Sequence, residues 1–241
     1  MIPKKIHYCW FGRGAMPELA IKCIDSWKKH LPDYEVKEWN EDNFDLDMYP
    51  YTREAYDNRK FAFVTDIVRL YALYTEGGIY MDTDVEVLKP LDEFLCHSAF
   101  SGFESPKDVL TAIMGAERGS LWAKDNLDYY KGKHFLMKDG SLDMTTNVRI
   151  ITDLMVSHGL KRKDMFQDFP KYVTFYPSDF FCPINITTKC LHLTENSATI
   201  HHFAGSWVSS KKDIKYWVKK ILGKKITRAI ISIKHINDKN G

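Results

Sequence analysis

The stretch from Phe61 to Leu88 constrains this chain more than any other, because it sets several structural signals in a fixed order. Apolar residues recur at helical spacing up to Thr75, and Gly77-Gly78 then ends the helix, since glycine adopts positive φ without steric cost. Ile79-Tyr80-Met81 follows as a short apolar strand, with Asp82-Thr83-Asp84 directly after it. The stretch therefore predicts a helix over 61–75 and a buried strand that carries two carboxylates at its end.

The residues before this stretch predict a βαβ unit. Ile6 to Phe11 is a short apolar run that ends at Gly12, Pro17 to His30 has helical periodicity, and Tyr34 to Trp39 alternates like a strand. Strand, helix and strand at this spacing favour parallel pairing with a right-handed crossover. Farther along we expect helices at 122–130 and 147–158, a strand at 172–175 and a loop at 180–183. The pattern indicates an α/β domain over residues 1–210.

Composition agrees with one enzyme-sized domain. The chain has 241 residues, of which 44% are hydrophobic, and can bury one large core. Its five cysteines are odd in number and dispersed, which is typical of a reducing setting rather than a disulfide scaffold. The first residues have too few apolar side chains for a signal peptide, and no later run approaches the length of a membrane span. We therefore expect a cytoplasmic protein.

The net charge of +2 is distributed unevenly. Residues 211–241 carry ten Lys and Arg against two Asp, so the body of the chain is acidic. The apolar residues of this tail recur at helical spacing between the lysines: Ile214, Trp217, Val218, Ile221 and Leu222. The pattern predicts a basic amphipathic helix that either lies on an anionic membrane surface or packs on the body. Nucleic acid is not expected as a partner, because no recognition motif accompanies the charge.

Two pairs of charged residues are the candidates for chemistry. Asp82 and Asp84 are two apart, so they would project to one side of a strand. Neighbouring carboxylates repel each other, and a hard cation such as Mg²⁺ or Mn²⁺ removes that cost while leaving positions for water and a substrate phosphate. Asp66 and Arg69 lie one turn apart in an otherwise apolar helix, where charges usually pair internally or line a pocket. These four are the candidate catalytic residues.

In these residues the chain resembles the DXD-motif glycosyltransferases of the family 32 type, which include bacterial capsule and polysaccharide transferases and Och1-like enzymes. The resemblance lies in D-x-x-R, Gly-Gly-Ile-Tyr and D-x-D, in the opening Ile2 to Gly12, and in the Ser26-Trp27 and Trp39-Asn40 pairs. The glucosylating domains of large clostridial toxins are similar in the same places. The resemblance implies a GT-A fold, Rossmann-like, with a mostly parallel central sheet flanked by helices.

The resemblance also implies a role for individual residues. Asp82 and Asp84 would engage Mn²⁺ or Mg²⁺ and through it the diphosphate of a nucleotide sugar, while Asp66 and Arg69 would bind the sugar hydroxyls. Trp10 would stack on the base; for Trp10 and Tyr80 the alternative, and the more frequent role of such residues, is that of a core aromatic. The other implied donor contacts are Asn40, Thr65, Tyr80, Asn147, Ser206 and Trp207.

A third metal ligand is expected late in the chain. Ala198 to Trp207 predicts a strand that runs into a glycine loop, and its His-x-x-Gly with a following Trp resembles the C-terminal metal-binding segment of retaining GT-A enzymes. By strand alternation we assign His202 as the ligand and expect His201 to point away. A structural role for a histidine on a strand is the alternative.

Together these residues predict a metal-dependent glycosyltransferase of polysaccharide synthesis, which moves a hexose from a nucleotide sugar, with UDP favoured, to a saccharide or lipid-linked saccharide. The resemblance implies retention of anomeric configuration, and no second carboxylate stands out as an inverting general base. A nucleotide-sugar hydrolase and a non-catalytic carbohydrate- or membrane-binding module on the same fold stay open. Peripheral contact with the inner face of the plasma membrane is expected through 211–241.

Overall fold

The structure is a computed structural model that describes residues 1–205. Residues 1–186 and 190–203 form one compact unit, which holds every helix and strand named below. Ser206, Trp207 and the basic tail at 211–241 lie outside the described residues. Within the described part, no helix has both the length and the apolar character that crossing a bilayer demands.

In the described residues the central sheet has seven strands, in the order β2-β1-β3-β6-β5-β8-β7. Their bounds are β1 Lys5–Cys9, β2 Glu35–Trp39, β3 Gly78–Met81, β5 Ala99–Gly102, β6 Ile113–Ala116, β7 Gln167–Phe169 and β8 Val173–Tyr176. β1 pairs in parallel with β2 and β3, and β5 in parallel with β8, whereas β6 and β7 run the other way. Five of these seven strands share one direction, so the predicted α/β class with a mostly parallel sheet is confirmed.

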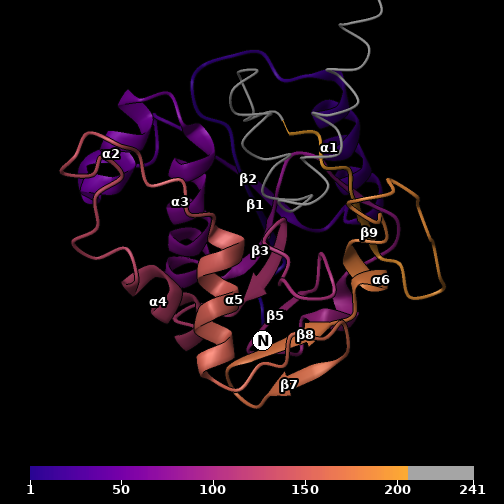
Figure 1. Ribbon diagram of the computed structural model, residues 1–241. Coiled ribbons are helices and arrows are strands. Elements are labelled where there is room, and N and C mark those ends of the chain that lie inside the picture. Colours follow the sequence, from indigo (N-terminus) through magenta and orange to yellow (C-terminus); the bar gives the residue numbers. More distant parts are fainter. Residues whose placement is uncertain (206–241) are drawn as a thin grey trace, which may run out of the picture. The chain divides into compact units, whose positions relative to one another are not determined.

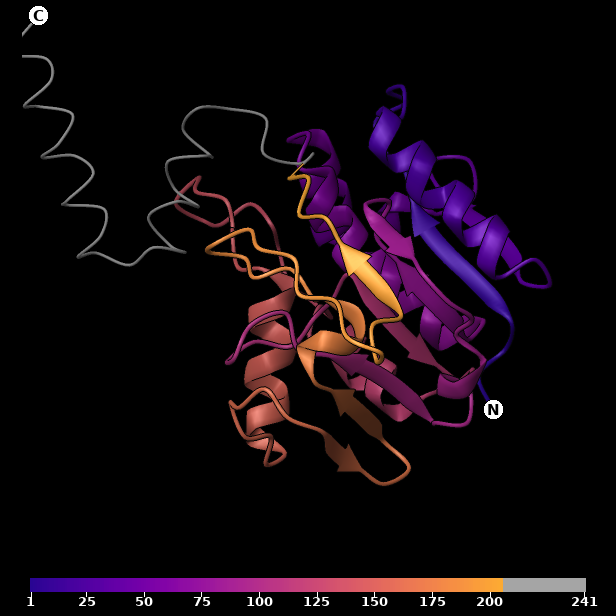
Figure 2. The same cartoon turned by 90° about the vertical axis from the view of Figure 1, so that its right-hand side faces the viewer.

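Helices cover both faces of the sheet (Figure 1). One face carries α3 (Phe61–Thr75), α4 (Leu121–Asp128) and α5 (Asn147–Ser157), with α2 (Pro50–Asp57) packed on α3. The other carries α1 (Glu18–His30), α6 (Ser178–Phe181) and the two-stranded pair of β4 (Val85–Val87) with β9 (Thr199–His201). Figure 2 looks onto this second face, with α1 and β9 toward the viewer. A separate buried hydrophobic cluster fills each face, so the sheet is covered on both sides.

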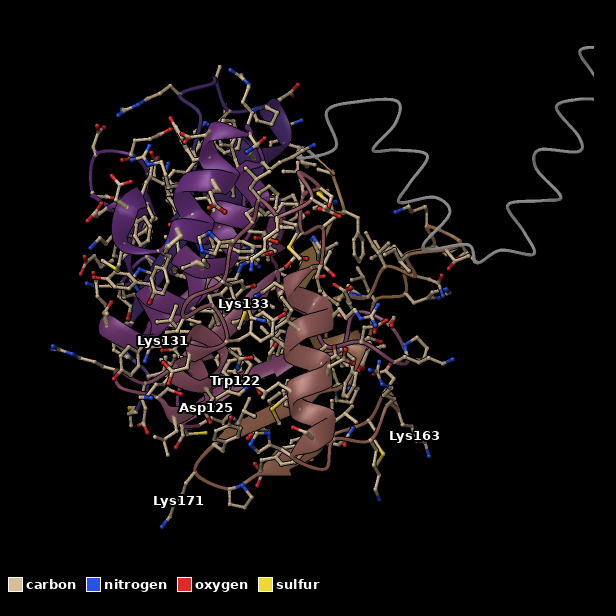
Figure 3. The ribbon with its side chains drawn as sticks, turned by 60° about the vertical axis from the view of Figure 1, so that its left-hand side comes forward. Trp122, Asp125, Lys131, Lys133, Lys163 and Lys171 are labelled. Atoms are coloured by element: carbon tan, nitrogen blue, oxygen red, sulfur yellow. The ribbon has the colours of Figure 1, made fainter. Side chains whose placement is uncertain are left out.

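The first face is shown in Figure 3, with α5 in front and Trp122 and Asp125 of α4 beside it. Trp122 is fully buried and packs edge-on against Phe175 of β8, with ring centroids 6.1 Å apart. Asp125 accepts a hydrogen bond from the Tyr172 hydroxyl at 2.8 Å. These contacts fix α4 to the β8 side of the sheet, while the Lys163 side chain points outward (Figure 3).

The double glycine after α3 lets β3 approach β1 closely. α3 spans Phe61–Thr75, as the sequence predicted. Gly77 and Gly78 both have positive φ, of 70° and 120°. A Cβ on Gly78 would lie 2.5 Å from the Lys5 carbonyl oxygen, so a side chain there would push β3 away from β1.

The loop expected at 180–183 was wrong in part. Ser178–Phe181 forms the short helix α6, and Phe181 is fully buried. Its ring packs against Phe94 and Phe100, at centroid distances of 4.9 and 5.6 Å. The aromatic pair at this position therefore belongs to the core of the second face rather than to an exposed connection.

Candidate active site

Asp82 and Asp84 lie in a turn at the carboxyl end of β3. The Asp82 N–H donates to the Ala112 carbonyl at 2.8 Å, and its own carbonyl accepts from the Val85 N–H at 3.0 Å. The acidic pair therefore sits between β3 and β4 and not on a continuing strand, so the alternation argument does not apply to it. The turn nevertheless brings the two carboxylates together, because Asp82, Asp84 and His201 offer ligand atoms that all lie within 4.8 Å of one another.

The two histidines take the opposite places from those expected. His201 Nε2 lies 3.5 Å from Asp84 Oδ1, whereas His202 Nε2 is hydrogen-bonded to Glu86 Oε2 at 2.9 Å. β9 pairs antiparallel with β4, with His201 opposite Val85, and directly opposed residues share a face. His202 therefore shares the face of Glu86, and its N–H donates to the Asp84 carbonyl at 3.0 Å. Alternation does separate the two rings, but the turn directs the Asp84 carboxylate toward His201 and not toward the histidine opposite it.

α1 holds β4 in place behind the turn. The Trp27 indole N–H donates to the Val85 carbonyl at 2.7 Å, and Ser26 Oγ accepts a hydrogen bond from the Val87 N–H at 2.9 Å. Both partners lie in the strand that follows Asp84. The Ser26-Trp27 pair thus fixes the strand that the acidic turn leads into.

Arg69 connects the candidate sugar-binding pair to the acidic turn. Its Nη2 lies 3.3 Å from Asp66 Oδ1 and 3.4 Å from Asp82 Oδ1. Its Nη1 donates to the Thr111 carbonyl at 2.6 Å. Only 6% of the Arg69 side chain is exposed. The Asp66–Arg69 pair is therefore not a surface salt bridge on α3. One buried cation is shared by the buried carboxylate of Asp66 and the half-buried carboxylate of Asp82.

Tyr80 contacts both Asp82 and Arg69. Its hydroxyl donates to Asp82 Oδ1 at 2.6 Å, and its ring centroid lies 4.6 Å from the Arg69 guanidinium carbon, within cation–π range. The side chain is almost completely buried. Tyr80 therefore orients both Asp82 and Arg69.

The electrostatics of the cluster favour an added positive charge. Burial raises the pKa of Asp66 to about 7, with Arg69 opposing the rise and Asp82 adding to it. Burial likewise raises the pKa of Asp82, against the opposing effect of Arg69, and Asp84 raises it further. Neighbouring carboxylates in a medium of low dielectric constant are unfavourable in their charged form. A bound cation would stabilise the charged form instead.

His201 is in the protonation state that metal binding requires. Burial lowers its pKa, although Asp84 and Asp82 oppose the effect, so the ring is neutral at physiological pH. Its Nδ1 is buried and has no hydrogen-bond partner among residues 1–205. Two carboxylates and a neutral imidazole form a donor set that fits Mn²⁺ or Mg²⁺.

Asn147 joins the cluster from the first turn of α5. Its backbone N–H donates to Asp66, and its side-chain amide donates to the Tyr130 hydroxyl at 3.0 Å. Its Oδ1 is buried without a partner in the described part of the chain. The amino end of α5 therefore faces Asp66 and leaves one carbonyl oxygen that a ligand hydroxyl can satisfy.

The other predicted donor residues have local partners. Trp10 follows β1 and donates from its indole N–H to the Gly14 carbonyl at 2.6 Å. Asn40 follows β2 and donates to Glu38 Oε1 at 2.7 Å, while the Thr65 hydroxyl donates to the Phe61 carbonyl within α3 at 3.1 Å. β1 and β2 are parallel to β3, so Trp10 and Asn40 lie along the same sheet edge as the acidic turn. Ser206 and Trp207 lie outside the described residues.

Comparisons with known proteins find similarity to glycosyltransferases. Residues 17–101 match the family described as the glycosyltransferase sugar-binding region containing DXD motif. Inositol phosphoceramide mannosyltransferase 3 of Schizosaccharomyces pombe is 33% identical over 122 residues, which cover 49% of this chain and 34% of the relative. An uncharacterized glycosyltransferase of Acanthamoeba polyphaga mimivirus is 28% identical over 166 residues, which cover 66% of each chain.

Among solved structures, the PaToxG glycosyltransferase aligns with a TM-score of 0.46 and 19% identity, over 65% of this chain and 70% of that chain. The chain spans about a third of the length of the yeast relatives it matches. The matched family segment holds Asp66, Arg69 and the acidic turn. Over residues 17–101, the chain is therefore similar to the sugar-binding region of the DXD-containing glycosyltransferase family.

Proposed function

We propose that this chain is a metal-dependent, retaining glycosyltransferase that moves a hexose from a nucleotide sugar to a saccharide or lipid-linked saccharide. The observation that carries the proposal is the convergence of Asp82, Asp84 and His201 next to the buried Asp66–Arg69 pair. A UDP-sugar is the favoured donor by the resemblance to the toxin domains. One relative is named a mannosyltransferase, so a mannose donor belongs among the candidates.

In this proposal, different residues of the cluster bind the metal ion and the sugar. A bound Mn²⁺ or Mg²⁺ would neutralise the charge that develops on the departing diphosphate. Asp82, Asp84 and His201 would hold that ion. Arg69 and Asp66 would bind sugar hydroxyls, and the unpartnered Asn147 Oδ1 would accept a hydrogen bond from one of them.

Residues around this cluster would bind the base and cover the diphosphate of the donor. Trp10 would stack on the base, with Asn40 and Thr65 nearby. Ser206 and Trp207 would cover the diphosphate, an assignment that rests on sequence resemblance.

Two alternative functions differ in their products or ligands. A nucleotide-sugar hydrolase would release free sugar at the same rate with and without an acceptor. A non-catalytic module would need none of the buried charges, each of which costs free energy to bury. The intact Asp66–Arg69–Asp82 arrangement supports a transferase over a module.

A thermal-shift screen with UDP- and GDP-sugars tests donor class and metal dependence together. A donor at about 100 times its Kd should raise the melting temperature by about 5 to 10 °C, and only with Mn²⁺ present. His201→Ala should lose this Mn²⁺-dependent rise because it removes a ligand. His202→Ala is the matched control and should keep it, since that ring bonds Glu86.

Two outcomes would contradict parts of this proposal. If no nucleotide sugar shifts the melting temperature of the wild type, the transferase function fails. If His201→Ala behaves as wild type while His202→Ala loses the shift, the ligand is the neighbouring histidine.

We also propose that residues 211–241 hold a cytoplasmic enzyme on an anionic membrane, because each Lys near such a surface contributes about 1 kcal/mol. Deleting them should release the protein from phosphatidylserine vesicles in a sedimentation assay. Neutral phosphatidylcholine vesicles are the control. Equal sedimentation of the full-length and truncated proteins would favour packing of the tail on the body.

A further inference from the structure

The loop of residues 10–14 follows β1 and carries Trp10, the residue proposed to stack on the base. The Trp10 N–H donates to the Trp39 carbonyl at 2.9 Å, so the loop leaves the sheet beside the end of β2. The half-buried indole ring is tied to the loop itself, through the hydrogen bond from its N–H to the Gly14 carbonyl. The orientation of the ring therefore depends on the path of the backbone between Trp10 and Gly14.

Two consecutive residues of this loop have positive φ. Gly12 has a φ of 92° and Arg13 a φ of 57°. A Cβ on Gly12 would lie 2.4 Å from a ring carbon of Phe61, so a side chain there would collide with that ring. Positive φ is uncommon and unfavourable for a residue with a long side chain, and it persists where surrounding contacts determine the conformation. The loop therefore depends on contacts from outside it.

Glu41, two residues beyond β2, supplies such contacts. Only 10% of its side chain is exposed. Its Oε1 accepts hydrogen bonds from the Gly12 N–H at 2.6 Å and from the Tyr56 hydroxyl of α2 at 2.9 Å. Its Oε2 is buried and lies 3.6 Å from Arg13 Nε. One carboxylate thus joins both residues of positive φ to a neighbouring helix.

The contacts of Glu41 are stronger than the other ion pair of the loop. Burial raises the pKa of Glu41. The hydrogen bonds from Gly12 and Tyr56, together with the charge of Arg13, outweigh this effect and hold the pKa of the carboxyl below its ordinary value, so it is an anion at neutral pH. Arg13 also pairs with Asp42, at 2.7 and 2.5 Å, but both side chains are exposed and such pairs contribute little. Hydrogen bonds to a buried carboxylate are stronger, which makes Glu41 the main anchor of the loop.

We propose that Glu41 is a positioning residue for the nucleotide: it holds residues 10–14 in the conformation in which the Trp10 ring stacks on the base. The inference rests on the proposed glycosyl transfer and on Trp10 as the stacking residue, and it adds the residue that acts through Trp10. A ring held in place before the donor binds avoids the loss of conformational freedom that ordering the loop would entail. The diphosphate separates the base from the bond that breaks, so this contribution is the same in the ground state and the transition state.

Glu41→Ala removes these contacts and leaves Trp10 in the chain. The full-length protein is titrated calorimetrically with UDP and with GDP in the presence of Mn²⁺. We expect the Kd of the tighter nucleotide to rise about 10-fold, a loss within the range of one base–aromatic stack. In turnover assays with the donor that the thermal-shift screen identifies, KM should rise by a similar factor while kcat stays as in the wild type. Glu41→Gln keeps the size of the side chain, so it serves if Glu41→Ala does not fold, and it should show a smaller loss in the same direction.

A double-mutant cycle shows whether Glu41 acts through Trp10. Trp10→Ala alone should raise the Kd at least as much as Glu41→Ala does. Adding Glu41→Ala to Trp10→Ala should raise it no further, because the two changes remove the same interaction. Glu76→Gln is the matched control, because Glu76 is a half-buried carboxylate that accepts from Lys5 and Lys37 at 3.1 and 2.6 Å. It precedes β3 and so lies at the opposite edge of the sheet, and its substitution should leave the Kd unchanged whatever it does to the melting temperature.

Three results would overturn the inference. One is a Kd in Glu41→Ala and Glu41→Gln equal to that of the wild type. Another is an equal loss from Glu41→Ala with and without the Trp10 ring, which would make its effect independent of that ring. The third is an unchanged Kd in Trp10→Ala, because Glu41 would then have no stacking residue to hold. If the wild type binds neither nucleotide and turns over no nucleotide sugar, the proposed function fails irrespective of Glu41, and the inference falls with it.

Discussion

Asp84→Asn should lower release of nucleoside diphosphate by about 10² to 10³-fold, which corresponds to about 3 to 4 kcal/mol of transition-state stabilisation. Asparagine keeps the shape of the side chain but removes the negative charge that would hold the cation beside Asp82 and His201. The Mn²⁺ concentration that gives half-maximal turnover should rise as well. Turnover measured over a series of Mn²⁺ concentrations separates weakened ion binding from a slower reaction.

Glu86→Gln is a suitable control for this variant. Glu86 lies in β4 two residues beyond Asp84 and bonds to His202, outside the group of converging ligands. Its substitution removes a nearby negative charge without removing a ligand, so turnover should change little. Equal turnover of Asp84→Asn and the wild type would exclude a metal-holding role for Asp84.

Arg69→Met should destabilise the fold by about 3 to 5 kcal/mol, the usual cost of breaking a buried ion pair from one side. Methionine fills much of the space but leaves the buried Asp66 and the half-buried Asp82 without their shared cation, and the Thr111 carbonyl without its donor. Urea unfolding of the protein without added metal measures the loss. Arg53→Met is the control, because Arg53 pairs with Asp47 on the surface and its loss should cost under about 1 kcal/mol.

The loss of stability in Arg69→Met should shrink in acid. A carboxyl whose folded-state pKa is raised contributes stability below its unfolded value, and this contribution is lost as the pH rises through the folded-state pKa. For Asp66 that window runs from the ordinary aspartate pKa of 3.8 to about 7. Removing Arg69 takes away the effect that lowers the pKa of Asp66, so the variant should gain more stability than the wild type between pH 7 and pH 5. An equal cost at both pH values would show that the arginine acts through packing rather than charge.

Local patterns predicted the part of the site that one continuous segment builds. Asp66, Arg69, Tyr80 and the acidic turn follow one another within α3 and β3, where helical period and the double glycine fix their relative places. The turn itself was expected to continue the strand. It does not, because the Asp82 carbonyl accepts from the Val85 N–H and closes the chain on itself, a tertiary outcome that alternation does not reveal.

Tertiary contacts decided between the two histidines. The pairing of β9 with β4 brings both of them next to the acidic turn, and the conformation of that turn places the Asp84 carboxylate beside His201. The strands β5 and β6 had no detectable signal in the sequence, because they are four-residue segments that each contain a glycine. The segment between these two strands is joined to the site by tertiary contacts, because the Thr111 and Ala112 carbonyls accept hydrogen bonds from Arg69 and from the Asp82 N–H.

The pairing of β4 with β9 has a consequence for how an ion would act on the whole chain. The hydrogen bond between His202 and Glu86 joins positions 116 residues apart, and the candidate ligands Asp84 and His201 lie beside it. An ion held there would close a loop of about this length in the same way as a reversible covalent cross-link. The loss of freedom in the unfolded chain grows with loop length, so metal occupancy would stabilise the fold by joining β4 in the middle of the domain to β9 at its end.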